Sequence, residues 1–100
     1  LDGAVISAVN LAEVLGKMAE YGKPRAVTAA ALARLRLPVI PFDEIQAGHV
    51  ADLREPTRAA GLSLGDRACL ALGRVCEAAV LTTDRAWADL EIGVTVEVIR

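Results

Sequence analysis

The sequence is poor in cysteine, histidine and aromatic residues: it has two cysteines, one histidine and one residue each of Phe, Trp and Tyr among 100. Cys69 and Cys76 fall on one expected helix, where about 1.5 Å of rise per residue separates their Cα atoms by roughly 10 Å, too far for a disulfide. We expect two buried, unbridged thiols. A disulfide-stapled secreted scaffold is therefore excluded.

Long apolar runs are also missing. No stretch approaches the about 20 residues that a membrane-spanning helix needs, and the N-terminus shows neither the basic start nor the cleavage pattern of a secretory signal. We expect a cytoplasmic protein without a membrane partner. The formal net charge of −2 offers no broad basic footprint for non-specific nucleic-acid binding, and the basic residues, nine of the eleven being Arg, are scattered.

A hydrophobic content of 54% with 24% charged residues excludes wholesale disorder, and the length predicts one small domain over residues 1–100. Hydrophobic periodicity predicts alternating strands and helices, with Ser7, Asp43 and Ser63 as capping residues at helix starts and Gly61 as a residue that ends a turn or short helix. We expect strands at 4–7, 37–42, 78–82 and 94–99, and helices at 8–22, 24–36, 43–55, 63–75 and 84–90, with a turn or short helix at 56–61. This order indicates an α/β layer with a mostly parallel sheet.

One carboxylate, Asp66, stands at the start of an otherwise apolar helical segment. Ser63 followed by Asp66 fits a capping box, in which the two side chains satisfy free amides of a helix start. The alternative is that Asp66 belongs to a metal-binding acidic cluster, which requires further acids nearby. Ligands of parallel sheets gather at the carboxyl ends of the strands, and Glu13 and Asp84 both follow expected strands.

Each of these two acids also has a plain structural interpretation. Glu13 could form an exposed pair with Lys17, worth only about 0.3–0.5 kcal/mol, and Asp84 could simply cap a helix. Three converging carboxylates would instead require a hard cation such as Mg²⁺ or Mn²⁺, as in metal-dependent nucleases and phosphatases. His49, the only histidine, is expected to be a surface or half-buried packing residue.

Three stretches together resemble the PIN-domain ribonucleases of the VapC toxin family: "VISAVNLAEVLGK" at 5–17, "TRAAGLSLGDRACLALG" at 57–73 and "VLTTDRAW" at 80–87. The resemblance implies a three-layer PIN-like fold and an endoribonuclease that uses Mg²⁺ or Mn²⁺, forms a homodimer and is inhibited by a cognate antitoxin. The residues that it places in the catalytic and metal-binding site are Glu13, Asp66 and Asp84, with Thr82 and Asn10 as supporting polar residues.

The chain also departs from that family. PIN domains of this type begin with a strand that ends in an aspartate, some thirty residues before the segment that matches residues 5–17, and Asp2 does not occupy that position. The resemblance therefore implies a PIN-like domain that is truncated at its N-terminus and lacks one of four metal-binding acids. The two strands expected at 4–7 and 78–82 would then border a gap in the sheet.

Three functions follow as hypotheses. The leading one is a toxin ribonuclease that hydrolyses RNA phosphodiester bonds with a metal-activated water, with Arg67 as a candidate phosphate contact or else a surface arginine. The second is a catalytically inactive PIN fragment that binds an antitoxin or a second copy of itself through the apolar faces of its first two helices. The third is a metal-dependent phosphatase that acts on small substrates.

Overall fold

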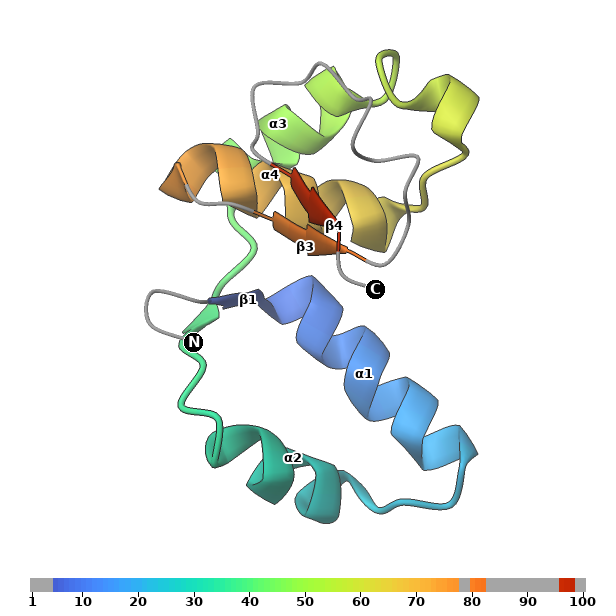
Figure 1. Cartoon of the computed structure of the whole chain (residues 1–100), viewed down its shortest axis with the longest axis vertical. Helices are drawn as coiled ribbons and strands as arrows, with labels where there is room; N and C mark the ends of the chain where they lie inside the picture. Colours follow the sequence, from blue (N-terminus) through green and yellow to red (C-terminus); the bar gives the residue numbers. More distant parts are fainter. Residues whose placement is uncertain (1–4, 78–79, 83–95, 99–100) are drawn as a thin grey trace. The chain divides into compact units, whose positions relative to one another are not determined.

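A computed structural model of the chain describes residues 5–77, 80–82 and 96–98 (Figure 1). The chain divides into two compact units, Leu1–Phe42 and Asp43–Arg100. None of the helices described has the length and apolar character needed to cross a membrane.

The first unit contains two short parallel strands and two helices. Their bounds are β1 Ile6–Ser7, α1 Ala8–Glu20, α2 Arg25–Ala33 and β2 Val39–Ile40. β1 pairs with β2 in parallel, with Ile6 opposite Val39. Ser7 ends β1 and starts α1, because its buried Oγ accepts a hydrogen bond from the Val9 backbone N–H at 3.2 Å. A strand therefore leads directly into a capped helix, and α1 packs against α2.

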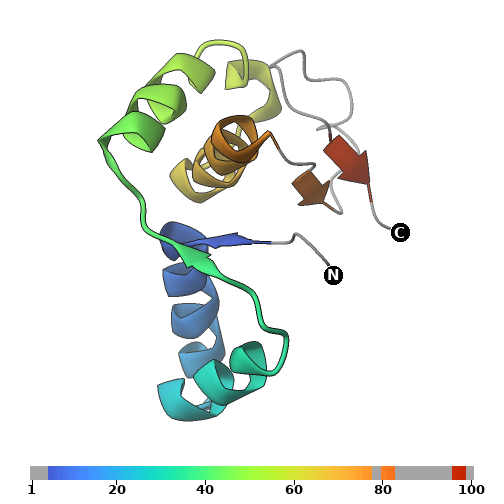
Figure 2. The ribbon, with the colours of Figure 1, turned by 90° about the vertical axis from the view of Figure 1, so that its left-hand side faces the viewer.

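The second unit contains two α-helices, a short 3-10 helix and another pair of parallel strands. Their bounds are α3 Glu44–Leu53, η1 Arg58–Ala60, α4 Leu64–Cys76, β3 Val80–Thr82 and β4 Val96–Val98. β3 pairs with β4 in parallel, with Thr82 opposite Val98. Figure 2 shows α4 beside α3, and β3 packs next to α4.

The core of the second unit lies between α3 and α4. The buried apolar side chains are Val50 and Leu53 from α3, and Ala68, Leu70, Ala71 and Leu72 from α4. Leu70 and Leu72 are two positions apart and lie on different faces of α4, so this helix is buried on more than one side. Asp43 starts α3 by accepting a hydrogen bond from the Gln46 backbone N–H at 2.9 Å, so each helix of this core has a side-chain cap at its start.

These elements confirm the expected α/β class with parallel strand pairing. Helices α1, α3 and α4 begin directly after predicted capping residues, and α2 begins directly after Pro24. Strands β1 and β2 are shorter than predicted. The helix predicted at 84–90 lies outside the described residues. Neither cysteine forms a disulfide, as expected, but the prediction that both thiols are buried is wrong: Cys76 is exposed and Cys69 is half-buried. Cys76 is the last residue of α4 and lies beyond the buried residues of that helix, the last of which is Gly73.

Glu77, which ends α4, provides a test of this helix terminus. It is exposed and has a left-handed backbone with φ 51° and ψ 41°, while its N–H reaches the carbonyls of Gly73 and Arg74. A side chain in this conformation costs roughly 1–2 kcal/mol relative to glycine. We expect Glu77→Gly to raise the free energy of unfolding by about 1 kcal/mol, as measured by urea denaturation followed by circular dichroism.

The matched control is Glu20→Gly, at the last residue of α1, where the backbone is helical and glycine has no such advantage. There we expect a loss of about 1 kcal/mol. Destabilisation of the Glu77→Gly variant would show that the left-handed terminus of α4 is not present in solution.

Candidate active site

The best-defined predicted site residue is Asp66, in the first turn of α4. The Ser63 backbone N–H donates to Asp66 Oδ2 at 3.0 Å, and the Asp66 N–H donates to Ser63 Oγ at 3.1 Å. The predicted capping box is therefore confirmed. The cap uses Oδ2 of a half-buried carboxylate, and the negative charge lies near the positive end of the helix dipole, where it is stabilised.

Glu13 lies on α1, away from the half-buried apolar face of that helix. Its Oε1 accepts a hydrogen bond from Asn10 Nδ2 at 3.1 Å. The two predicted polar residues of α1 are thus neighbours one turn apart, and Asn10 can restrict the orientation of the exposed Glu13 carboxylate. This contact differs from the pairing with Lys17 that we considered from the sequence.

Two further predicted residues follow α4 in the chain. Thr82 is the last residue of β3, so its backbone stands at the carboxyl end of a parallel strand, where the sequence pattern predicts polar site residues. Asp84 lies outside the described residues.

Arg67 follows Asp66 on α4 and is half-buried. Its Nη1 donates to the Val50 backbone carbonyl at 3.4 Å. Because this partner is neutral, the contact fixes the guanidinium without cancelling its charge.

His49, on α3, is half-buried with a buried Nδ1 that has no hydrogen-bond partner in the described part of the chain, in keeping with a packing residue.

A cation site of three ligands is not formed by the described residues alone: within them, no three His, Cys, Asp or Glu side chains are grouped closely enough to hold a metal ion. Glu13 and Asp66 belong to different compact units. The donor chemistry does fit Mg²⁺ or Mn²⁺, since both residues offer carboxylate oxygens, the ligands that hard cations prefer. The joint role of Glu13, Asp66 and Asp84 thus stays a prediction.

Each unit also has a pocket that the sequence did not predict. The pocket in the first unit, about 280 Å³, is apolar, and its lining includes Leu11, Leu15, Leu32 and Val39. The pocket in the second unit, about 310 Å³, is lined by three arginines, Arg54, Arg58 and Arg67, together with Thr57, Gly61 and Leu62. The sequence signals for the second pocket are Arg67, a candidate phosphate contact from the sequence, and the pair Arg54 and Arg58, placed four residues apart in "REPTR".

Comparisons with known proteins agree on the fold. The sequence model of the PIN domain matches residues 1–93. A chain of the crystal structure of VapBC2 from Rickettsia felis bound to a DNA fragment from their promoter superposes with a TM-score of 0.77 at 17% identity, over 96% of this chain and 74% of that chain. At this identity the likeness shows the fold. No curated protein matches the sequence.

The capping box supplies a test of local stability. Ser63→Ala removes the acceptor for the Asp66 N–H, and we expect it to lower the free energy of unfolding by about 1 kcal/mol. Asp66→Asn keeps a side-chain oxygen that can accept from the Ser63 N–H, so we expect a smaller loss. Thermal and urea denaturation measure both. Equal stability of Ser63→Ala and the unaltered chain would contradict the box.

Proposed function

The chain belongs to the PIN-domain family, and from that premise we propose that it is an RNA-cleaving toxin of the VapC type, a Mg²⁺- or Mn²⁺-dependent endoribonuclease paired with an antitoxin. The observation that carries the proposal is the Asp66 carboxylate, held by Ser63 at the start of a helix whose next turns are buried. Rigid support of this kind is what a metal-binding carboxylate needs.

Glu13, Asp66 and Asp84 are the residues that would hold the cation. When bound, such an ion activates a water for attack and stabilises negative charge on a phosphodiester. Among this chain's residues, Ser63 restricts the Asp66 carboxylate and Asn10 restricts that of Glu13. Thr82 is proposed as a hydroxyl that supports the site from the end of β3. The RNA substrate, the antitoxin partner, the homodimer and the cytoplasmic location follow from the family resemblance and are parts of the same proposal.

A second candidate function is a binding module without catalysis, which would join an antitoxin or a second copy of the chain. The apolar pocket of the first unit favours it, because α1 and α2 contribute most of its lining and its side chains are aliphatic. Exposed apolar surface of this kind commonly marks a protein contact. The two candidate functions are compatible in a toxin that cuts RNA and also binds an antitoxin. They differ in whether the activity of the chain depends on the carboxylates of Glu13, Asp66 and Asp84.

The test is RNA cleavage by the purified chain with Mn²⁺. We expect the Asp66→Asn, Asp84→Asn double variant to lose activity by about 100-fold or more, since metal ions stabilise transition-state charge by several kcal/mol and 1.36 kcal/mol corresponds to tenfold. Removal of the metal with a chelator should have the same effect on the unaltered chain, and added Mn²⁺ should restore cleavage.

The control is Asp43→Asn, which removes one carboxylate charge at the start of α3, where the double variant removes two, and leaves a capping amide there. It should cleave RNA as the unaltered chain does. Equal activity of the double variant and the control would refute the assignment of the acids. A folded chain that shows no metal-dependent RNA cleavage would exclude the ribonuclease and favour the binding module. Hydrolysis of small phosphate monoesters without RNA cleavage would favour a phosphatase.

A further inference from the structure

The pocket of the second unit is built where α3 ends and α4 begins. Arg54 follows the last residue of α3, Arg58 is the first residue of η1, and Arg67 lies in the first turns of α4. Three guanidinium groups from different segments of the chain thus line one pocket of about 310 Å³. No carboxylate is among the lining residues in the part of the chain that the structure describes.

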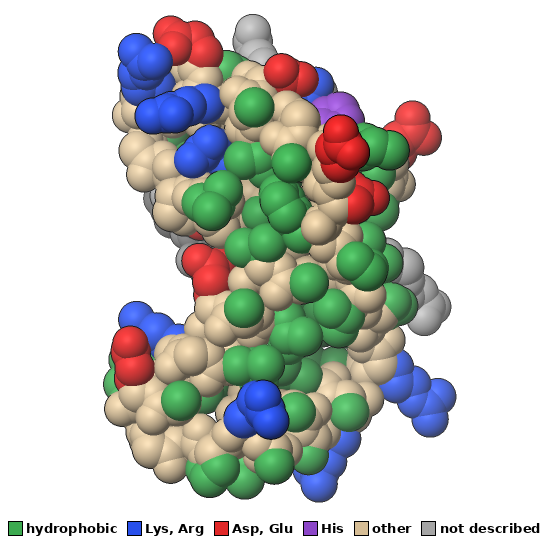
Figure 3. All heavy atoms as spheres, turned by 180° about the vertical axis from the view of Figure 1, so that it is seen from behind, with side chains coloured by type: hydrophobic (Ala, Val, Ile, Leu, Met, Phe, Trp, Pro, Cys, Tyr) green, Lys and Arg blue, Asp and Glu red, His purple; other side chains and the backbone are tan. Residues whose placement is uncertain are grey.

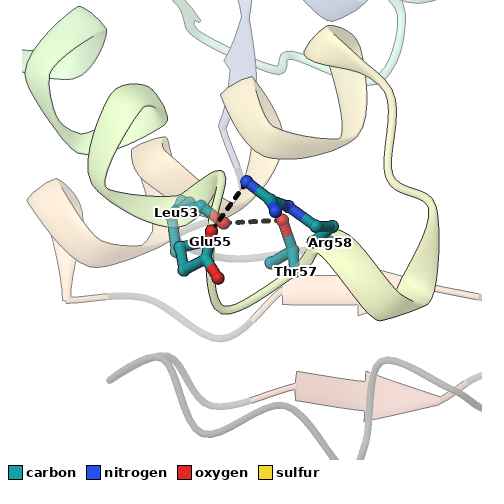
Figure 4. Close-up of polar contacts among 4 residues, drawn as sticks. All are labelled: Leu53, Glu55, Thr57 and Arg58. Atoms are coloured by element: carbon teal, nitrogen blue, oxygen red, sulfur yellow. Dashed lines mark hydrogen bonds and ion pairs between the residues drawn. The ribbon is translucent and has the colours of Figure 1, made fainter.

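The turn between α3 and η1 holds this arrangement in place. Thr57 is buried, and its hydroxyl donates to the Leu53 carbonyl at 2.6 Å (Figure 4). At the far side of η1, Gly61 has a left-handed backbone with φ 65°, which turns the chain toward Ser63. Two contacts therefore hold the backbone that carries Arg54 and Arg58: the Thr57 hydroxyl bond, and the bond of 3.1 Å that the Gly61 N–H donates to the Arg58 carbonyl. Neither uses an arginine side chain.

Little in the described part of the chain neutralises the three arginines. Arg58 pairs with Glu55 at 2.8 Å, but the two side chains are 71% and 77% exposed, and ion pairs this exposed contribute little. Arg67 is bonded to a neutral carbonyl, and Arg54 is exposed with no described side-chain partner. Figure 3 shows basic side chains gathered on the surface of this unit. Three like charges around one pocket favour an anion within it.

Guanidinium groups match phosphate oxygens in charge and in the spacing of their N–H donors. The position of the pocket also relates it to the proposed chemistry, because Arg67 directly follows Asp66 on α4. Because consecutive residues of a helix do not share a face, the pocket and the Asp66 carboxylate would contact different phosphates of one strand. The exposure of Arg54 and Arg58 suits a long strand lying across the surface better than a small, enclosed ligand.

We propose that the pocket lined by Arg54, Arg58 and Arg67 binds a phosphate group of the RNA backbone other than the one that is cleaved. The inference rests on the proposed function for its choice of RNA. It assigns these arginines to holding the strand, which gives affinity that depends on salt and is insensitive to sequence.

The experiment measures binding without cleavage. Fluorescence anisotropy measures the binding of a single-stranded RNA of about 12 nucleotides, a length within the range that known single-strand-binding domains cover. The titrations contain excess chelator and are repeated at a series of salt concentrations. The variants are Arg54→Gln and Arg58→Gln, whose exposed side chains are not needed for the fold. Arg67→Gln is left aside, because it would also break the contact with Val50. Arg34→Gln, exposed on the first unit directly after α2, is the charge-matched control.

We expect Arg54→Gln and Arg58→Gln each to weaken RNA binding several-fold at low salt. The slope of log affinity against log salt should become shallower by about 0.7 for each phosphate of the single strand that the variant no longer neutralises. Arg34→Gln should change neither quantity by as much. Circular dichroism confirms that every variant is folded.

Three results would overturn the proposal: no RNA binding by the unaltered chain, equal effects of Arg34→Gln and the pocket variants, or calorimetric binding of inorganic phosphate that depends on Arg54 while RNA affinity does not. The last result would assign the pocket to free phosphate. Because chelator is present, the binding measurement is independent of catalysis. RNA affinity that falls when Arg54 or Arg58 is replaced supports the inference even in a chain that fails to cut RNA. RNA cleavage with an affinity that these substitutions leave unchanged contradicts the inference.

Discussion

The reciprocal bonds between Ser63 and Asp66 are the constraint on which the proposed chemistry depends. They determine where α4 begins, and the residues that follow in α4 form the core with α3. The carboxylate at the start of this helix is therefore anchored to the most buried part of the unit. Since the cap needs only Oδ2, the helix start and a cation could use the two oxygens of one side chain. The plain interpretation of Asp66 and the functional one are compatible.

The start of α4 carries groups of opposite charge in consecutive positions. Asp66 offers an anionic ligand suited to a hard cation, and Arg67 offers a cation suited to phosphate, fixed by the Val50 carbonyl of α3. A phosphodiester needs both kinds of contact, one at the reacting group and one along the strand. Because both side chains depend on how α4 packs on α3, a change in that packing would be expected to affect RNA binding and catalysis together.

The local rules of capping and turns predicted much of the fold. Ser7, Asp43 and Ser63 each start a helix with the predicted side-chain bond, because such bonds involve residues only two or three positions apart. Gly61 ends η1 as glycine's conformational freedom suggested. The exposure of Cys76 was mispredicted because burial depends on how far along α4 its neighbours in the fold cover it, which no local pattern encodes. The arginine pocket was missed for a related reason: it exists only once α3, η1 and α4 have packed. The roles of Glu13, Asp66 and Asp84 were inferred from their positions beside expected strands and helix starts and from the family resemblance, and they call for a direct measurement.

That measurement is calorimetric titration of Mn²⁺ into the purified chain, compared with the Asp66→Asn and Asp43→Asn variants. Both substitutions remove one charge from a helix-capping residue and leave an amide that can cap. We predict that the unaltered chain and Asp43→Asn bind Mn²⁺ alike, while Asp66→Asn binds at least about tenfold more weakly, a loss of about 1.4 kcal/mol. Equal Mn²⁺ affinity in all three, or no Mn²⁺ binding by the folded chain, would contradict the claim that Asp66 is a metal ligand and would leave it as a helix cap.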